Sequence, residues 1–183
     1  MSTRSVATAH GIVGFITCAC LIIFYAAGEP FGTSNDVGNA LLGLLSLALA
    51  GLLRRPAPAP TRSDRVLLGI AAVGAALTVA GTVLVVSGIT GFYLAGLWSA
   101  AGFGLIGVWL VGISRRVRPT GMVAGVVMLL GLLGVPGIFM GIDDMDNAPV
   151  WTFVAGVSWA GTYLLFPAWS LRLARRDRPE RLG

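Results

Sequence analysis

Six long apolar runs, separated by short polar connections, restrict the fold of this chain more than any other sequence feature. A helix that crosses the hydrocarbon core of a bilayer needs about 20 apolar residues, so six spans use about 120 residues. The chain has 183 residues, which leaves no length for a separate soluble domain. We therefore predict an all-α fold, an integral membrane bundle of six transmembrane helices that forms one domain over residues 1–183. The predicted spans are residues 6–27, 37–53, 66–87, 92–113, 121–142 and 150–171, and residues 172–183 form a basic tail.

The composition excludes the two other broad classes of protein. Apolar residues make up 56% of the chain and charged residues only 11%, less than half the share typical of soluble proteins. A soluble domain of this size would need far more polar surface to cover itself. Intrinsic disorder requires the opposite balance, with low hydrophobicity and high charge.

The charges predict how the spans are threaded through the bilayer. All 13 basic residues are arginines: one precedes the first span, four lie between the second and third, three between the fourth and fifth, and five follow the sixth. With the N-terminus in the cytoplasm, every arginine falls on the cytoplasmic side, as the positive-inside rule requires. We predict a cytoplasmic-membrane protein with both termini in the cytoplasm. Because the arginines cluster beside apolar runs, the net charge of +5 indicates membrane orientation and not a nucleic-acid partner.

Membrane lipids are the expected partners of such a chain. The arginine-rich tail, residues 172–183, is expected to bind anionic lipid, since each basic residue adds attraction to a negatively charged surface. Small residues recur four residues apart, as at Gly96, Ala100 and Gly104, and such stripes let helix backbones approach closely in lipid. The glycine-rich faces indicate packing within the bundle or, alternatively, a face for a homo-oligomer or a membrane partner.

Local signals predict where the spans begin and bend. The sequence from Thr33 to Asp36 has the form of a capping box, so Thr33 is expected to cap the second span and Asp36 to reach back to it. Pro136 and Pro167 lie inside the fifth and sixth spans, where each removes a backbone donor and is expected to kink its helix.

Three side chains near the inner membrane surface are predicted to be interfacial. Trp109 and Trp169 fall near the inner ends of their spans and are expected to form part of an aromatic belt. His10 lies about one turn into the first span, where we expect its ring to face the lipid headgroups.

A cluster of oxygen ligands in the third outer loop is the first candidate site. Asp143, Asp144 and Asp146 supply three carboxylates within four positions, and Asp36 is expected across the same outer mouth. Hard cations favour clustered oxygen ligands, so these four acids are the candidate metal ligands. The alternatives are a solvated acidic loop that helps to orient the protein, or catalytic carboxylates. No catalytic residue or cofactor is assigned, because the sequence has no serine–histidine–acid set and no phosphate-binding loop.

The few hydroxyl groups inside the spans are the second candidate site. They could bind a small uncharged ligand, or they could instead form hydrogen bonds between helices. The candidate ligand-binding residues are Thr78, Ser99, Ser158, Thr162 and Tyr163.

Two short motifs carry a resemblance to known proteins. The segment from Phe31 to Asp36 before the second span and the motif from Phe166 to Trp169 in the last span resemble those of a group of uncharacterised bacterial multi-span membrane proteins with a G-T-x-N-D turn. The resemblance covers about ten residues and implies a location in a bacterial cytoplasmic membrane. It transfers no activity to this chain.

Three function classes fit these observations. The first is a passive permease or binding protein for a small or lipophilic molecule. The second is a structural or accessory membrane subunit that associates through its glycine faces. The third is a membrane-embedded enzyme that uses the outer carboxylates. A pocket between the third, fourth and sixth spans would favour the first class, and acids that converge on one point would favour the third.

Overall fold

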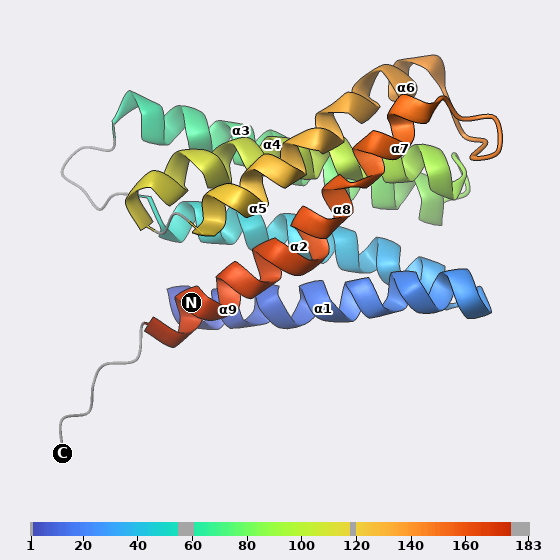
Figure 1. Cartoon of the computed structure of the whole chain (residues 1–183). Helices are drawn as coiled ribbons and strands as arrows, with labels where there is room; N and C mark the ends of the chain where they lie inside the picture. Colours follow the sequence, from blue (N-terminus) through green and yellow to red (C-terminus); the bar gives the residue numbers. More distant parts are fainter. Residues whose placement is uncertain (1, 55–60, 118–119, 177–183) are drawn as a thin grey trace.

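A computed structural model describes residues 2–54, 61–117 and 120–176, and these residues contain helices but no strand (Figure 1). Six helical stretches are long and apolar enough to cross a membrane. The predicted all-α, six-helix architecture is thereby confirmed, and the chain is a multi-pass membrane protein. Part of the predicted basic tail, from residue 177 onward, lies outside the described residues. The first four spans are the continuous helices α1 (Thr3–Ala27), α2 (Phe31–Leu52), α3 (Arg62–Val86) and α4 (Phe92–Val117).

The fifth and sixth spans are interrupted, as their prolines predict. A 3-10 segment immediately precedes the short helix that holds Pro136, and a π-helical segment immediately precedes the one that holds Pro167. A proline ring clashes with the carbonyl four residues earlier, so the irregular turn lies on its N-terminal side. The fifth span consists of α5 (Thr120–Leu129), η1 (Leu130–Gly134) and α6 (Val135–Met140); the sixth consists of α7 (Val150–Gly156), α8 (Ser158–Ala160), η2 (Gly161–Leu165) and α9 (Phe166–Arg176).

The two ends of the bundle differ in charge. The start of α1 and the end of α9 lie at the same end (Figure 1), which we call the basic end. The opposite end, which we call the acidic end, holds Glu29, Asp143, Asp144 and Asp146 in the connections that follow α1 and α6. The arginines whose side chains the structure describes all belong to the basic end: Arg4, Arg54, Arg62, Arg65, Arg115, Arg172 and Arg175.

The sixth span crosses the bundle obliquely (Figure 1). At the basic end α9 packs on α1, where Gly14 leaves space for the ring of Pro167 and Gly11 leaves space for Leu171. At the acidic end α7 packs instead against η1 and α4. The sixth span therefore diverges from α1 toward the acidic end.

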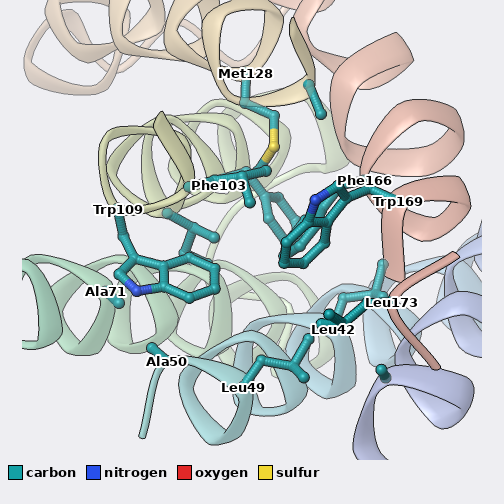
Figure 2. Packing of buried hydrophobic residues seen from close by; sticks show 14 of the residues in the cluster. Leu42, Leu49, Ala50, Ala71, Phe103, Trp109, Met128, Phe166, Trp169 and Leu173 are labelled. Carbon is teal, nitrogen blue, oxygen red and sulfur yellow. The ribbon is translucent and has the colours of Figure 1, made fainter. Parts of the chain in front are cut away.

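An aromatic cluster fills the interior at the basic half of the bundle (Figure 2). The ring of Phe166 lies 6.3 Å from that of Trp109 and 5.8 Å from that of Trp169, measured between centroids. Both tryptophans are only 2% exposed, so their predicted place in an interfacial belt is wrong. Gly121 explains the burial of Trp169, because a Cβ at that position would lie 2.7 Å from the indole nitrogen.

Glycines bring neighbouring helix backbones into direct contact. A Cβ on Gly74 would lie 2.6 Å from the carbonyl oxygen of Gly102, and the reverse distance is also 2.6 Å. Gly107 and Gly125 form a similar reciprocal pair between α4 and α5. These four glycines therefore serve packing within the bundle.

The start of α2 differs from the predicted capping box. The helix begins at Phe31, six positions before the predicted start of the span, and Asp36 lies inside it. Glu29 replaces the predicted cap, because its carboxylate accepts hydrogen bonds from the backbone nitrogen and the hydroxyl of Thr33 (3.2 and 3.1 Å). A true capping box occurs at the start of α3, where Thr61 and Asp64 bond reciprocally.

Candidate ligand-binding site

A cavity of about 350 Å³ lies at the acidic end, between the ends of α1, α4 and the α7–α8 segment. Its volume falls within the range of pockets that bind small molecules. The cavity is open on one side, and its walls are almost entirely apolar. Its position follows from the divergence of the sixth span, because α9 packs on α1 whereas α7 packs on η1 and α4.

Two glycines enlarge this cavity. Gly96 on α4 and Gly156 on α7 both line it, and a Cβ built on either would meet no heavy atom within 4 Å. They differ from the glycines at helix contacts, where a Cβ would collide with a neighbour. The cavity therefore extends to these two glycines, and larger side chains at either position would project into it.

Aromatic rings form much of the cavity wall, so we name it the aromatic cavity. The hydroxyl groups of the lining residues Tyr93 and Thr152 lie 2.6 Å apart and join α4 to α7. The rings of Tyr93 and Phe153 lie 6.4 Å apart between centroids. The five aromatic lining residues are Tyr25, Phe92, Tyr93, Phe153 and Trp159.

A small polar space, which we call the polar recess, adjoins the aromatic cavity. Its free volume is about 10 Å³, about the space that one water molecule needs. The recess and the cavity share four wall residues, Phe92, Gly96, Ala100 and Trp159, so the recess lies directly behind the cavity wall. The polar residues of the recess are Asn35, Asp36, Asn39, Ser99 and Tyr163.

Hydrogen bonds hold one side of the polar recess in place. The amide of Asn35 donates to the backbone oxygen of Thr17 on α1 (3.1 Å), and the amide of Asn39 donates to Oδ1 of Asn35 (3.4 Å). The hydroxyl of Tyr163 donates to Oδ1 of Asn39 (2.7 Å). This chain joins α1, α2 and η2 through side chains that are all buried.

Asp36 lies beside this chain of hydrogen bonds but takes no part in it. It is 8% exposed, and its carboxyl oxygens have no hydrogen bond or ion pair within residues 2–54, 61–117 and 120–176. Only its backbone oxygen is engaged, by the hydroxyl of Thr82 (2.6 Å). The predicted place of Asp36 at an outer loop is therefore wrong, because the early start of α2 carries it into the helix.

The structure separates the five predicted ligand-binding residues. Ser99 and Tyr163 both line the polar recess. Thr78 instead donates to the backbone oxygen of Ala75 (2.8 Å), at a close contact between helices. Thr162 donates to the backbone oxygen of Ser158 (3.2 Å), and the buried hydroxyl of Ser158 has no partner among the residues that the structure describes. The last three residues line neither the cavity nor the recess.

The outer acids have different local roles. Asp143 accepts hydrogen bonds from the backbone nitrogens of Gly91 (2.5 Å) and Leu94 (3.1 Å), and thereby caps α4. Asp144 accepts from the side-chain amide of Asn147 and from the backbone nitrogen of Asp146, and these bonds hold its pKa below the usual range. Nowhere in the described part of the chain do three or more histidine, cysteine or acidic side chains form a group that could hold a metal ion.

The predicted interfacial position of His10 is wrong. Its ring is 0% exposed and lies 4.1 Å from the ring of Phe166, between centroids. Nε2 lies 3.2 Å from the hydroxyl of Ser46, and Nδ1 lies 3.0 Å from that of Ser170. Because Ser46 gives its proton to the Leu42 carbonyl, we assign the neutral tautomer with its proton on Nε2. His10 thus joins α1, α2 and α9.

Sequence reasoning missed several residues of the site, including Asn39, Phe92, Gly96 and Trp159. One signal for the recess was present, because Asn35, Asn39 and Ser46 recur on one face of the otherwise apolar second span. The aromatic lining residues had no such signal, since they come from separate helices. No protein-family model, curated protein or solved structure matches the chain.

Proposed function

We propose that this multi-pass membrane protein binds a small lipophilic molecule in the aromatic cavity. The observation that carries the proposal is the cavity itself, which has a ligand-sized volume, apolar walls and two glycines that leave space free. A lipophilic molecule gains free energy by leaving water for such walls. The adjoining polar recess supplies the few polar groups that typically orient a ligand in an apolar pocket.

Binding fits this architecture better than passage through a permanent pore. The basic half of the bundle is filled by Trp109, Phe166, Trp169 and Leu42, all of them buried. A passive permease would need this cluster to open, whereas a binding protein would not. We therefore propose binding as the first function. Passive permeation is the second, and it would require the aromatic cluster of the basic half to open.

We also propose the orientation and the lipid contacts of the protein. The basic end faces the cytoplasm of a bacterial cell and the acidic end faces the exterior, which the distribution of arginines supports. Arg172 and Arg175 near the end of α9 then lie where the headgroups of anionic lipids gather.

Native mass spectrometry of gently solubilised protein tests the binding function. We expect the wild-type protein to retain a small-molecule adduct, and the cavity-filling variant Gly96→Leu to lose it. Gly69→Leu is the matched control, because Gly69 is exposed on α3 and also has no neighbour within 4 Å. An adduct of equal occupancy in all three proteins would contradict the proposal.

A further inference from the structure

We propose that the ligand of the aromatic cavity is a lipophilic organic cation, with a positively charged ammonium-type head between the Asp36 carboxylate and the aromatic walls. The inference rests on the proposed binding function and names the chemical class of its ligand. Three independent observations support it: an unpaired buried acid, an aromatic wall and the place where the two meet.

The first observation is the missing partner of Asp36. An ionised carboxylate buried away from water is costly unless a positive charge or several donors compensate it. Asp36 has neither in the described part of the chain, and the arginines there lie at the opposite end of the bundle. A bound cation would supply the charge that the protein itself does not.

The neighbouring polar groups leave the Asp36 carboxyl available. Asn35, Asn39 and Tyr163 bond to one another and to the backbone of α1, so they have their own partners. None of them donates to Asp36. These bonds hold one side of the recess in place beside the Asp36 carboxyl, and an anionic acceptor without a protein donor favours a cation.

The second observation is the aromatic wall. The faces of tyrosine, phenylalanine and tryptophan attract cations within about 6 Å of the ring centroid, and quaternary ammonium groups are typical ligands of such walls. Five aromatic residues line this cavity, on α1, α4 and the α7–α8 segment. They bind the apolar body of a ligand and attract its charge at the same time.

The third observation is the shared wall between cavity and recess. Gly96 and Ala100 carry no side chain or a single methyl group, so the partition is thinnest there. Phe92 and Trp159 complete the same partition. The recess has room for no more than a water-sized group, so the body of the ligand stays in the cavity and its head lies at this partition.

The charge of the acidic end supports the same class of ligand. The connections beside the cavity carry Glu29, Asp143, Asp144 and Asp146 and contain no basic residue. Such an end raises the local concentration of cations and steers them toward the opening. A neutral or anionic lipophile would gain nothing from this field.

Two probes of the same shape isolate the effect of charge: benzyltrimethylammonium and its neutral analogue neopentylbenzene, in which carbon replaces the nitrogen. Binding of each radiolabelled probe is measured to the full chain in nanodiscs of zwitterionic lipid, with empty nanodiscs subtracted. We expect the wild-type protein to bind the cation at least tenfold more tightly. We expect Asp36→Asn to weaken cation binding at least tenfold and to change neutral binding less than twofold.

Matched variants complete the experiment. Asp146→Asn removes one of the exposed charges that attract cations to this end, so it should weaken cation binding less than twofold, far less than Asp36→Asn does, and leave neutral binding unchanged. Trp159→Leu should weaken binding of the cation more than binding of the neutral probe, and it tests the aromatic wall even where Asp36→Asn fails to fold. Gly96→Leu should abolish the binding of both probes.

The outcomes separate the two proposals. Equal affinity for both probes, with binding lost in Gly96→Leu, would refute the inference that the ligand is a cation. The proposal that the cavity binds a lipophilic molecule would stand. A cation preference that persists in both Asp36→Asn and Trp159→Leu would also refute the inference. Binding of neither probe, or binding that Gly96→Leu does not change, would overturn the proposed function and the inference together.

Discussion

The hydroxyl of Tyr163 donates a 2.7 Å hydrogen bond to Oδ1 of Asn39, although 124 positions of the chain separate the two residues. Tyr163 lies in the π-helical segment η2, and Asn39 lies on α2. A π-helical turn is wider than an α-helical one and is frequent at functional sites. Here it carries the phenol that closes one side of the polar recess.

Tyr163→Phe is expected to destabilise the protein. The variant keeps the ring but leaves Oδ1 of Asn39 without its hydroxyl donor, at a cost of about 1 kcal/mol in the free energy of unfolding. Thermal unfolding in detergent measures the loss. Tyr25→Phe is the control, because Tyr25 is 56% exposed and should tolerate the change. Equal melting temperatures for the two variants would show that the bond contributes nothing.

Gly102→Ala is expected to disrupt the contact between α3 and α4. The added methyl would lie 2.6 Å from the carbonyl oxygen of Gly74, and because that oxygen belongs to the backbone of α3, the two helices must move apart. Overpacking of this kind costs about 1–3 kcal/mol. Gly69→Ala has open space around its methyl and should be neutral or slightly stabilising. A Gly102→Ala protein as stable as Gly69→Ala would mean that the two helices are not in backbone contact.

Asp143→Ala is expected to loosen the start of α4. Its carboxylate accepts from two backbone nitrogens there, at Gly91 and Leu94, and loss of such a cap costs about 1 kcal/mol. Hydrogen exchange of the first turn of α4 should rise, and the melting temperature should fall. Asp146→Ala removes a neighbouring charge that caps no helix, so exchange in α4 should stay as in the wild type. Identical exchange rates in both variants would show that Asp143 does not cap α4.

Reporter fusions test the proposed orientation. Fusions after Arg55, Arg116 and Arg176 should report the cytoplasm, because export of an arginine cluster opposes the positive-inside rule. Fusions after Gly88 and Asn147 should report the exterior. An exterior signal at Arg116 would contradict the proposed orientation, or the assignment of four membrane crossings before Arg116.

The architecture was predictable because it depends on hydrophobicity and length alone. The four continuous spans and the two interrupted ones follow from apolar runs and from Pro136 and Pro167, which act locally. The start of α2 was predicted wrongly for a local reason as well. Two capping signals compete there, and Glu29 caps the helix where Thr33 was expected to.

The burial of polar and aromatic side chains was not predictable in the same way. His10 and Trp169 were placed by their distance along a span, but burial depends on which neighbour faces them across the bundle. Glycines determine where a large side chain finds space between two helices, as Gly121 does beside Trp169. Only part of the candidate site was accessible from the sequence: Ser99 and Tyr163 were identified as interior polar groups, whereas Gly96 gave no sign of facing a cavity.

Photoaffinity labelling tests the central claim, occupancy of the aromatic cavity by a lipophilic molecule, most directly. The full chain in nanodiscs is irradiated with a small neutral aryl diazirine, and the labelled positions are mapped by peptide mass spectrometry. The cavity predicts saturable labelling within residues 92–100 and 152–159, which Gly96→Leu abolishes and Gly69→Leu preserves. Labelling that never saturates, spreads evenly over the outward faces of all six spans and persists in Gly96→Leu would contradict the account.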